Sequence, residues 1–143
     1  MIPETPLSSF TTRRRIEFAD TDMGGIVHFA RFFVFLETAE HEFLRAVGTT
    51  VHHQRDGHQV GWPRVSASLE YKSPARLGDD LTIDLRVVRK GAKSMTYDFT
   101  VRIGERLVAE GRMSSVCCVL NDPAGIRAIR IPPDIASRIV EAG

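Results

Sequence analysis

The sequence contains little cysteine, which limits the ways in which its fold can be held together. Two of the 143 residues are cysteines, and they are neighbours, Cys117 and Cys118. Adjacent residues on a strand point to opposite faces, so these two are not expected to pair with each other. They also lack the CxxC spacing of metal and redox sites. We therefore expect two unpaired thiols in a reducing compartment, and a fold that depends on its hydrophobic core.

The chain also lacks a large excess of charge and any long apolar run. Its formal net charge is +1, which gives no general attraction for nucleic acid or for an anionic membrane surface. No apolar stretch approaches the roughly 18 residues of a membrane-spanning helix. The first residues, MIPETPLSSF, have neither the basic start nor the apolar centre of a signal peptide. These absences predict a cytoplasmic protein that neither inserts into a membrane nor binds nucleic acid.

What is present is the composition of an ordinary globular domain. The sequence is 43% hydrophobic and 26% charged, with no internal repeat and no low-complexity segment. A chain of 143 residues is long enough for one domain with its own core. We therefore expect residues 1–143 to form a single domain.

One segment of this chain has strong helical periodicity. Between residues 29 and 47 apolar side chains recur at helical spacing, and Gly48 follows as a helix stop. The apolar stripe consists of Phe29, Phe32, Phe33, Leu36, Phe43, Leu44 and Val47, and is widened by Val34 and Phe35. Because apolar residues cover much of its circumference, this helix must be wrapped by other elements.

Five segments have the two-residue alternation that is typical of strands. They are residues 9–18, before the helix, and residues 64–72, 80–89, 94–103 and 107–120, after it. Gly111 lies within the last segment, which indicates a bulge or a close approach of backbone. Residues 49–62 are expected to be a loop or a short irregular helix, residues 128–131 a short strand, and the residues after Pro133 a small helix. Short connections favour antiparallel pairing, so the predicted fold is α+β, with one curved antiparallel sheet of about five strands around the helix.

An acidic and glycine-rich segment connects the first strand to the helix. It runs from Asp20 to Phe29 and has the sequence DTDMGGIVHF. Its carboxylates could cap a turn or the helix, or they could take part in acid–base or nucleophilic chemistry. Free N–H groups at a helix N-terminus can stabilise an oxyanion, and glycines allow the backbone to approach a substrate closely. The residues alone leave both interpretations open.

The longer stretch RIEFADTDMGGIVHFARFFVFLE, together with the tail RAIRIPPD, resembles the 4-hydroxybenzoyl-CoA thioesterase family in its YbgC-like branch. In that family a strand leads through the pattern (D/E)-x-D-x-x-G-(I/V)-V into the central helix of a hotdog fold. The matching positions are Asp20, Thr21, Asp22, Gly24 or Gly25, Ile26 and Val27. The resemblance implies an acyl-CoA thioesterase that needs neither metal nor cofactor, since coenzyme A is part of the substrate.

The resemblance also implies roles for individual residues. Asp22 is the implied catalytic carboxylate, either as a nucleophile on the thioester carbon or as a general base for water. The backbone N–H groups of Phe29 and His28 form the implied oxyanion site. The remaining residues implied to shape or support the site are Asp20, Gly24, Gly25 and Glu37. The chain has His28-Phe29 where the YbgC-like branch has Tyr-His, which rotates the histidine by about 100° around the helix.

Basic residues lie close together at a connection between two expected strands. The family has a basic cluster at this connection, so the resemblance implies that Arg89, Lys90 and Lys93 contact the nucleotide phosphates of CoA. Alternatively, they are the solvated charges of a hairpin tip. Arg127 and Arg130 are weaker candidates for the same contact.

The resemblance further implies an assembly and limits the possible functions. Hotdog proteins pair into dimers with a continuous sheet, which implies a homodimer at least, and more specifically a tetramer, with the active site at the dimer interface. A non-catalytic acyl-CoA or acyl-carrier binding protein is the alternative, although binding alone does not need the carboxylate of Asp22. The acyl group is open between a short or medium aliphatic chain and an aromatic ring. A ring could be lined by Phe29, Phe32, Phe33 and Trp62.

Overall fold

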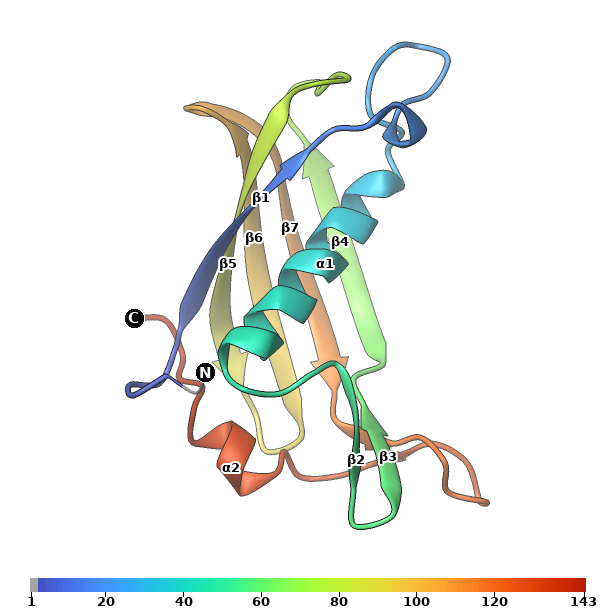
Figure 1. Cartoon of the computed structure of the whole chain (residues 1–143), viewed down its shortest axis with the longest axis vertical. Coiled ribbons are helices and arrows are strands. Elements are labelled where there is room, and N and C mark those ends of the chain that lie inside the picture. Colours follow the sequence, from blue (N-terminus) through green and yellow to red (C-terminus); the bar gives the residue numbers. More distant parts are fainter. Residues whose placement is uncertain (1–2) are drawn as a thin grey trace.

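The computed structural model describes residues 3–143, and its main sheet curves around one long helix. The strands of this antiparallel sheet lie in the order β1-β5-β6-β7-β4. They are β1 (Ser9–Arg15), β5 (Asp80–Lys90), β6 (Ser94–Ile103), β7 (Arg106–Val116) and β4 (Arg64–Tyr71). The helix α1 (Arg31–Ala46) crosses the concave face of the sheet (Figure 1). The expected hotdog architecture is therefore confirmed.

A second, smaller sheet was not expected. Its strands lie in the order β2-β3-β8-β9. They are β2 (His52–Arg55), β3 (His58–Gly61), β8 (Cys118–Val119) and β9 (Arg127–Ala128). The loop or irregular helix expected at residues 49–62 was wrong, because Asp56 and Gly57 both adopt positive φ angles, of 49° and 78°, and turn this segment into a hairpin. The chain ends after a short helix, α2 (Pro133–Ala136).

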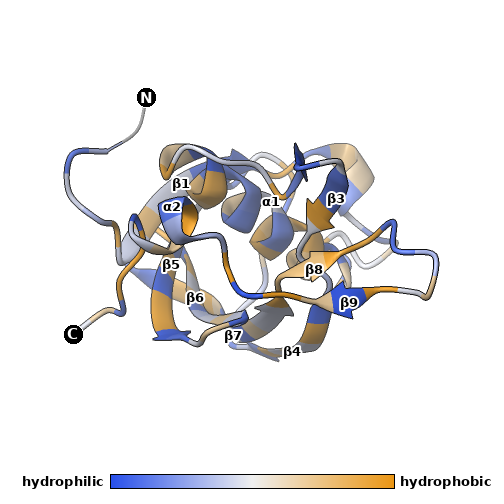
Figure 2. Cartoon of the chain, turned by 90° about the horizontal axis from the view of Figure 1, so that it is seen from below, coloured by the Kyte–Doolittle hydropathy of each residue, from blue (hydrophilic) through white to orange (hydrophobic). Residues whose placement is uncertain are grey.

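The hydrophobic core lies between α1 and the main sheet, as the view from below makes clear (Figure 2). Phe35, Leu36, Phe43 and Leu44 of the helix are fully buried. The ring of Phe43 meets that of Tyr97 on β6 edge-to-face, with 5.8 Å between centroids. Packing of these large side chains is what fixes the helix against the sheet.

Two phenylalanines that the periodicity assigned to buried faces are exposed instead. The side chain of Phe29 is 64% exposed, because α1 begins at Arg31 and Phe29 lies in the turn before it. Phe18 is 79% exposed, because β1 ends at Arg15 and a short 3-10 helix, η1 (Phe18–Asp20), follows. Both residues lie in the segment that connects β1 to α1, where strand and helix periodicity no longer apply.

Gly111 lies where the helix approaches the sheet closely. A Cβ atom at this position would be 3.0 Å from Cδ1 of Leu36 on α1 and 2.9 Å from the carbonyl oxygen of Ser68 on β4. Its pairing is regular, with Leu69 on one side and Phe99 on the other. Of the two expectations for this glycine, the close approach is confirmed and the bulge is not.

The main sheet has two edges of different character. The edge strand β1 carries three consecutive arginines, at residues 13–15. The opposite edge strand, β4, carries small or apolar side chains at residues 65–69, and Val65 is 65% exposed. Among residues 3–143, no helix is both long and apolar enough to span a membrane.

Candidate functional site

The carboxylate of Asp22 is held in a tight turn between η1 and α1. Its Oδ1 accepts a hydrogen bond of 2.8 Å from the backbone N–H of Gly24, and its carbonyl oxygen accepts one of 3.0 Å from Gly25. The backbone N–H of Asp22 donates to the carbonyl of Ile26 at 2.9 Å. Gly25 adopts a φ of 78°, a conformation that glycine adopts without strain. The turn leaves the Asp22 side chain exposed and presents it at the rim of a cavity.

Asp20 plays a different structural part, although it lies only two residues away. It is 1% exposed and accepts hydrogen bonds from the N–H of Glu17 at 2.9 Å and from Nη2 of Arg31 at 2.7 Å. Burial alone would raise the pKa of this carboxyl, but the hydrogen bonds from Glu17 and Arg31 and the charges of Arg14 and Arg31 together lower it. Asp20 is therefore an ionised anchor that ties the loop to the first residue of α1.

The backbone just before α1 contains one N–H group that is not committed. The N–H of His28 donates to the carbonyl of Asp20 at 2.8 Å, and the N–H of Ala30 donates to Nδ1 of His28 at 3.2 Å. The N–H of Phe29 has no acceptor among residues 3–143. Of the two amides proposed from sequence as oxyanion donors, that of His28 is already bonded and that of Phe29 is available.

A cavity of about 470 Å³ adjoins this loop and is lined mainly by apolar groups. Its lining includes Asp22, Phe29, Phe32, Tyr71, Lys72 and Ala75. The structure thus brings the Asp22 carboxylate and the Phe29 residue to one cavity, as thioester chemistry would require. Phe29 and Phe32 contribute aromatic surface, whereas Phe33 and Trp62 do not line it.

Glu37 and Trp62 lie at another cavity, of about 350 Å³, that also includes His41. The carboxylate of Glu37 is half-exposed and forms an ion pair of 3.4 Å with Nη1 of Arg64. Glu37 is therefore not adjacent to the Asp22 cavity within one chain.

Beneath Glu37, Glu40 is completely buried and depends on a small polar network. Its carboxylate accepts hydrogen bonds from Arg64 and, at 3.0 Å, from the hydroxyl of Ser115. Burial raises the pKa of the Glu40 carboxyl, against the opposing effects of the Arg64 charge and of the hydrogen bonds from Ser115 and Arg64. The sequence analysis did not detect this network, because Glu40 falls among the polar positions of the helix.

The basic hairpin between β5 and β6 lies at the opposite end of the sheet from Asp22 (Figure 1). The Asp22 loop contacts the residues before β5, where the N–H of Val27 donates to the carbonyl of Ala75 at 2.8 Å. The strand then runs for 11 residues, about 35 Å, before it reaches the hairpin. There Lys90 donates to the carbonyls of Ala136 and Ile139, at 2.9 and 2.8 Å, and so holds the C-terminal segment. Arg89 and Lys93 are exposed.

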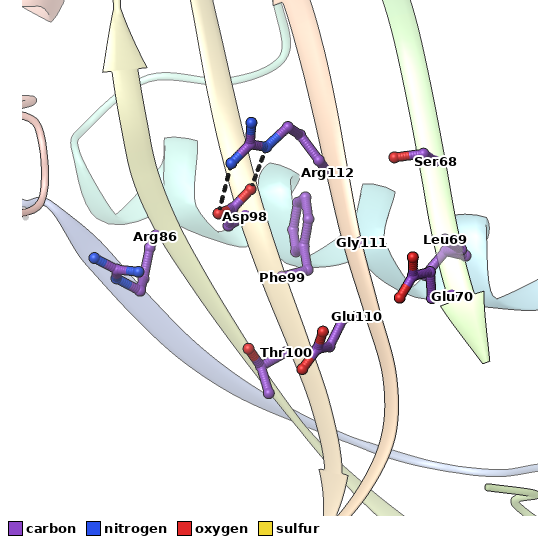
Figure 3. Close-up of a pocket in the computed structure, with 10 residues that line it drawn as sticks. All are labelled: Ser68, Leu69, Glu70, Arg86, Asp98, Phe99, Thr100, Glu110, Gly111 and Arg112. Carbon is purple, nitrogen blue, oxygen red and sulfur yellow. Dashed lines mark hydrogen bonds and ion pairs between the residues drawn. The ribbon is translucent and has the colours of Figure 1, made fainter. Parts of the chain in front are cut away.

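A cavity of about 500 Å³ lies on the outer face of the main sheet, away from α1 (Figure 3). Its surface is polar, and its charges are partly neutralised within the sheet. Arg112 donates to both carboxylate oxygens of Asp98, at 2.6 and 3.0 Å. This cavity lacks both an exposed loop carboxylate and a helix N-terminus, so it does not offer the chemistry of the Asp22 cavity.

The remaining candidate groups show no reactive arrangement. Burial, with the neighbouring Cys118 thiol, raises the pKa of the Cys117 thiol to about 11, against a lowering effect of Arg55. Within residues 3–143 no three His, Cys, Asp or Glu side chains gather closely enough to hold a metal ion.

The Asp22 cavity is also lined by residues that could not be assigned to a site from sequence. Tyr71, Lys72 and Ala75 come from the end of β4 and the turn after it. The periodicity treated Tyr71 as an ordinary strand residue, and only Pro74 marked the end of the strand. No local signal connects these residues to Asp22, because the connection is made by the fold.

Comparison with known proteins agrees with the geometry. Residues 16–139 match the family model described as the thioesterase-like superfamily. The 1,4-dihydroxy-2-naphthoyl-CoA hydrolase of Nostoc punctiforme is 31% identical over 109 residues, which cover 76% of this chain and 74% of the relative. The acyl-CoA thioester hydrolase YbgC of Escherichia coli O157:H7 is 28% identical over 128 residues, which cover 86% of this chain and 90% of the relative.

Solved structures share the whole fold. The 1,4-dihydroxy-2-naphthoyl-CoA thioesterase of Synechocystis superposes with a TM-score of 0.79 at 26% identity, covering 92% of this chain and 95% of that one. The 4-hydroxybenzoyl-CoA thioesterase of Pseudomonas sp. strain CBS-3 superposes with a TM-score of 0.78 at 26% identity, covering 91% of this chain and 98% of that one. The resemblance inferred from residues 15–37 is thus confirmed over most of the chain. With a family model that matches residues 16–139, the chain belongs to the thioesterase-like superfamily, and it has the hotdog fold.

Proposed function

We propose that this thioester hydrolase acts on acyl-CoA, releasing a free acid and coenzyme A, with Asp22 as its catalytic carboxylate. The observation that carries the proposal is that Asp22 and Phe29, whose N–H is uncommitted, line one largely apolar cavity beside the start of α1. A carboxylate there can attack the thioester carbon or activate water, and both routes place negative charge on the carbonyl oxygen. A free amide at the positive end of a helix suits that charge.

The experiment that tests this proposal is a panel of aromatic and aliphatic acyl-CoAs, assayed by release of the CoA thiol. We expect turnover without added metal or cofactor, with the fastest substrates among acyl groups that fill the cavity of about 470 Å³. The binding alternative predicts saturable acyl-CoA binding without thiol release. Binding with no release from any member of the panel would therefore overturn the hydrolase assignment.

The CoA portion of the substrate raises the question of assembly. Arg89 and Lys93 are separated by about the length of β5, roughly 35 Å, from the loop that carries Asp22. They can therefore contact CoA bound at this loop only from another subunit, and Lys90 is already bonded to the C-terminal segment. We propose a homodimer at least, formed through β4, because an exposed edge with small and apolar side chains invites pairing whereas the arginines of β1 oppose it.

A charge placed on the β4 edge should break this assembly. Ala67 is exposed at the middle of β4, and an Ala67→Lys change would bring two like charges together when β4 pairs with its copy. We expect the dimer to weaken on the order of a hundredfold. Sedimentation velocity or light scattering would measure the change, with Ser9→Lys on the β1 edge as the matched control. A native protein that remains monomeric at high concentration would contradict the proposed assembly.

A further inference from the structure

Tyr71, the last residue of β4, is bonded directly to the backbone that carries the proposed oxyanion donor. Its hydroxyl donates a hydrogen bond of 2.9 Å to the carbonyl oxygen of Phe29, a residue 42 positions earlier in the chain. The Tyr71 side chain also lines the Asp22 cavity. One side chain thus joins the end of an edge strand to the turn that precedes α1.

The other polar contacts of this turn are local, so the Tyr71 bond is the one that ties Phe29 to the sheet. The N–H of His28 donates to the carbonyl of Asp20, and the carbonyl of His28 accepts a hydrogen bond of 2.9 Å from the N–H of Arg31. Phe29 itself has an exposed side chain, which packs only loosely through a stacked contact of 4.7 Å with the His28 ring. The Tyr71 hydroxyl holds the carbonyl of the Phe29–Ala30 peptide, which is joined at the Phe29 Cα to the peptide that carries the free N–H. Without this bond the whole turn could shift relative to the sheet, and the Phe29 N–H would move with it.

Tyr71 is itself held firmly enough to act as a support. Its ring meets the buried ring of Phe32 edge-to-face, with 5.6 Å between centroids. Partial burial raises the pKa of the Tyr71 phenol, so its hydroxyl keeps its proton at neutral pH and remains a donor. Because that proton is given to the Phe29 carbonyl, Tyr71 is not available as a proton donor to the leaving thiolate.

We infer that Tyr71 is a positioning residue of this active site, which fixes the turn at Phe29 relative to the sheet so that the Phe29 N–H faces the thioester oxygen. The inference rests on the proposed function, since it assigns Tyr71 a part in that same reaction. Support of an oxyanion donor matters in the transition state more than in substrate binding. Loss of the hydroxyl should therefore lower kcat and leave KM nearly unchanged.

The sequence offers a matched pair of tests, because it contains only two tyrosines, Tyr71 and Tyr97. Tyr97 is fully buried, and its hydroxyl has no hydrogen-bond partner in the part of the chain that the structure describes. A Tyr71→Phe change keeps the ring against Phe32 and removes only the hydroxyl. We expect kcat to fall about 10- to 100-fold with KM within about twofold, whereas Tyr97→Phe should leave both unchanged.

The outcomes separate this inference from the proposed function. If the native protein releases no thiol from acyl-CoA, the proposed function fails. If the native protein is active and Tyr71→Phe, folded as judged by thermal unfolding, keeps its full kcat, the positioning role alone fails. A raised KM with unchanged kcat would also overturn it, since that pattern identifies a substrate contact. If kcat falls equally in Tyr71→Phe and in Tyr97→Phe, the effect is a general structural one, and this result would likewise contradict the inference.

Discussion

An Asp22→Asn variant should hydrolyse acyl-CoA with a kcat about 10²- to 10⁴-fold below that of the native protein. Asparagine retains an oxygen that can accept the Gly24 N–H bond of 2.8 Å, so the turn should keep its shape. What is lost is the negative charge, and with it both the nucleophile and the general base. Steady-state thiol release would measure kcat, and binding of a non-hydrolysable acyl-CoA analogue should change little.

The chain provides a close control for this substitution. Asp122 makes the same kind of turn, with its Oδ1 accepting the N–H of Ala124 two residues on at 2.9 Å, in the loop between β8 and β9. Asp122→Asn therefore makes the same change in a similar turn outside the proposed site, where the carboxylate also accepts a hydrogen bond of 3.1 Å from Arg127. Unaltered turnover in Asp22→Asn would show that the carboxylate takes no part in the reaction.

Removal of Arg64 should cause a large loss of stability. In an Arg64→Met variant the fully buried Glu40 loses its positive partner, and such stranded charges cost about 3–5 kcal/mol of unfolding free energy. Urea denaturation at fixed protein concentration would measure the loss. Arg112→Met is the control, because an ion pair as exposed as Arg112–Asp98 should contribute little to stability.

The pH dependence of this loss follows from the direction of the Glu40 pKa shift. Burial raises the pKa of Glu40 above its usual value of 4.5, so the folded state binds the proton more tightly than the unfolded chain. This tighter proton binding stabilises the folded state fully at pH values below 4.5, and the stabilisation is lost as the pH rises through the folded-state pKa of Glu40. The charge of Arg64 lowers this pKa, so without Arg64 it rises further, and the deficit of Arg64→Met should shrink between pH 7 and pH 5. A deficit that is the same at both pH values would mean that removal of Arg64 does not change the protonation of Glu40 between pH 5 and pH 7.

The fold could be predicted from sequence to the extent that each element carries its own periodicity. Five alternating segments and one apolar helix were enough to give the main sheet and its central helix, and Gly48, with a φ of 87°, ends the helix as expected. The second sheet could not be predicted in this way, because β8 and β9 have two residues each and show no period. The β2–β3 hairpin did carry a sequence signal, because Asp56-Gly57 is a typical hairpin turn. This signal should have outweighed the polar composition that favoured a loop.

The site was predictable only where it is continuous in sequence. Asp20, Asp22 and the two glycines lie in one motif, and the structure gathers them in one loop. The place of Tyr71 at the cavity could not be predicted, because it reaches the cavity from a strand about 50 residues later through the curvature of the sheet. Arg89 and Lys93 show the opposite case, in which residues are close together in sequence but far from the site. A basic cluster in the sequence does not indicate how far it lies from the Asp22 carboxylate.

The absence of a side chain at Gly111 has a consequence for tolerance to mutation. The helix touches the sheet here through Leu36, five residues, or about 7.5 Å, from the first residue of α1. Any larger residue would press on Leu36 of α1 and on the Ser68 carbonyl of β4, so the helix or the strand would have to shift. A shift of the helix would change the distance between the proposed oxyanion amide of Phe29, just before α1, and the proposed catalytic carboxylate of Asp22. We therefore expect a substitution at Gly111, which does not line the Asp22 cavity, to lower turnover as well as stability.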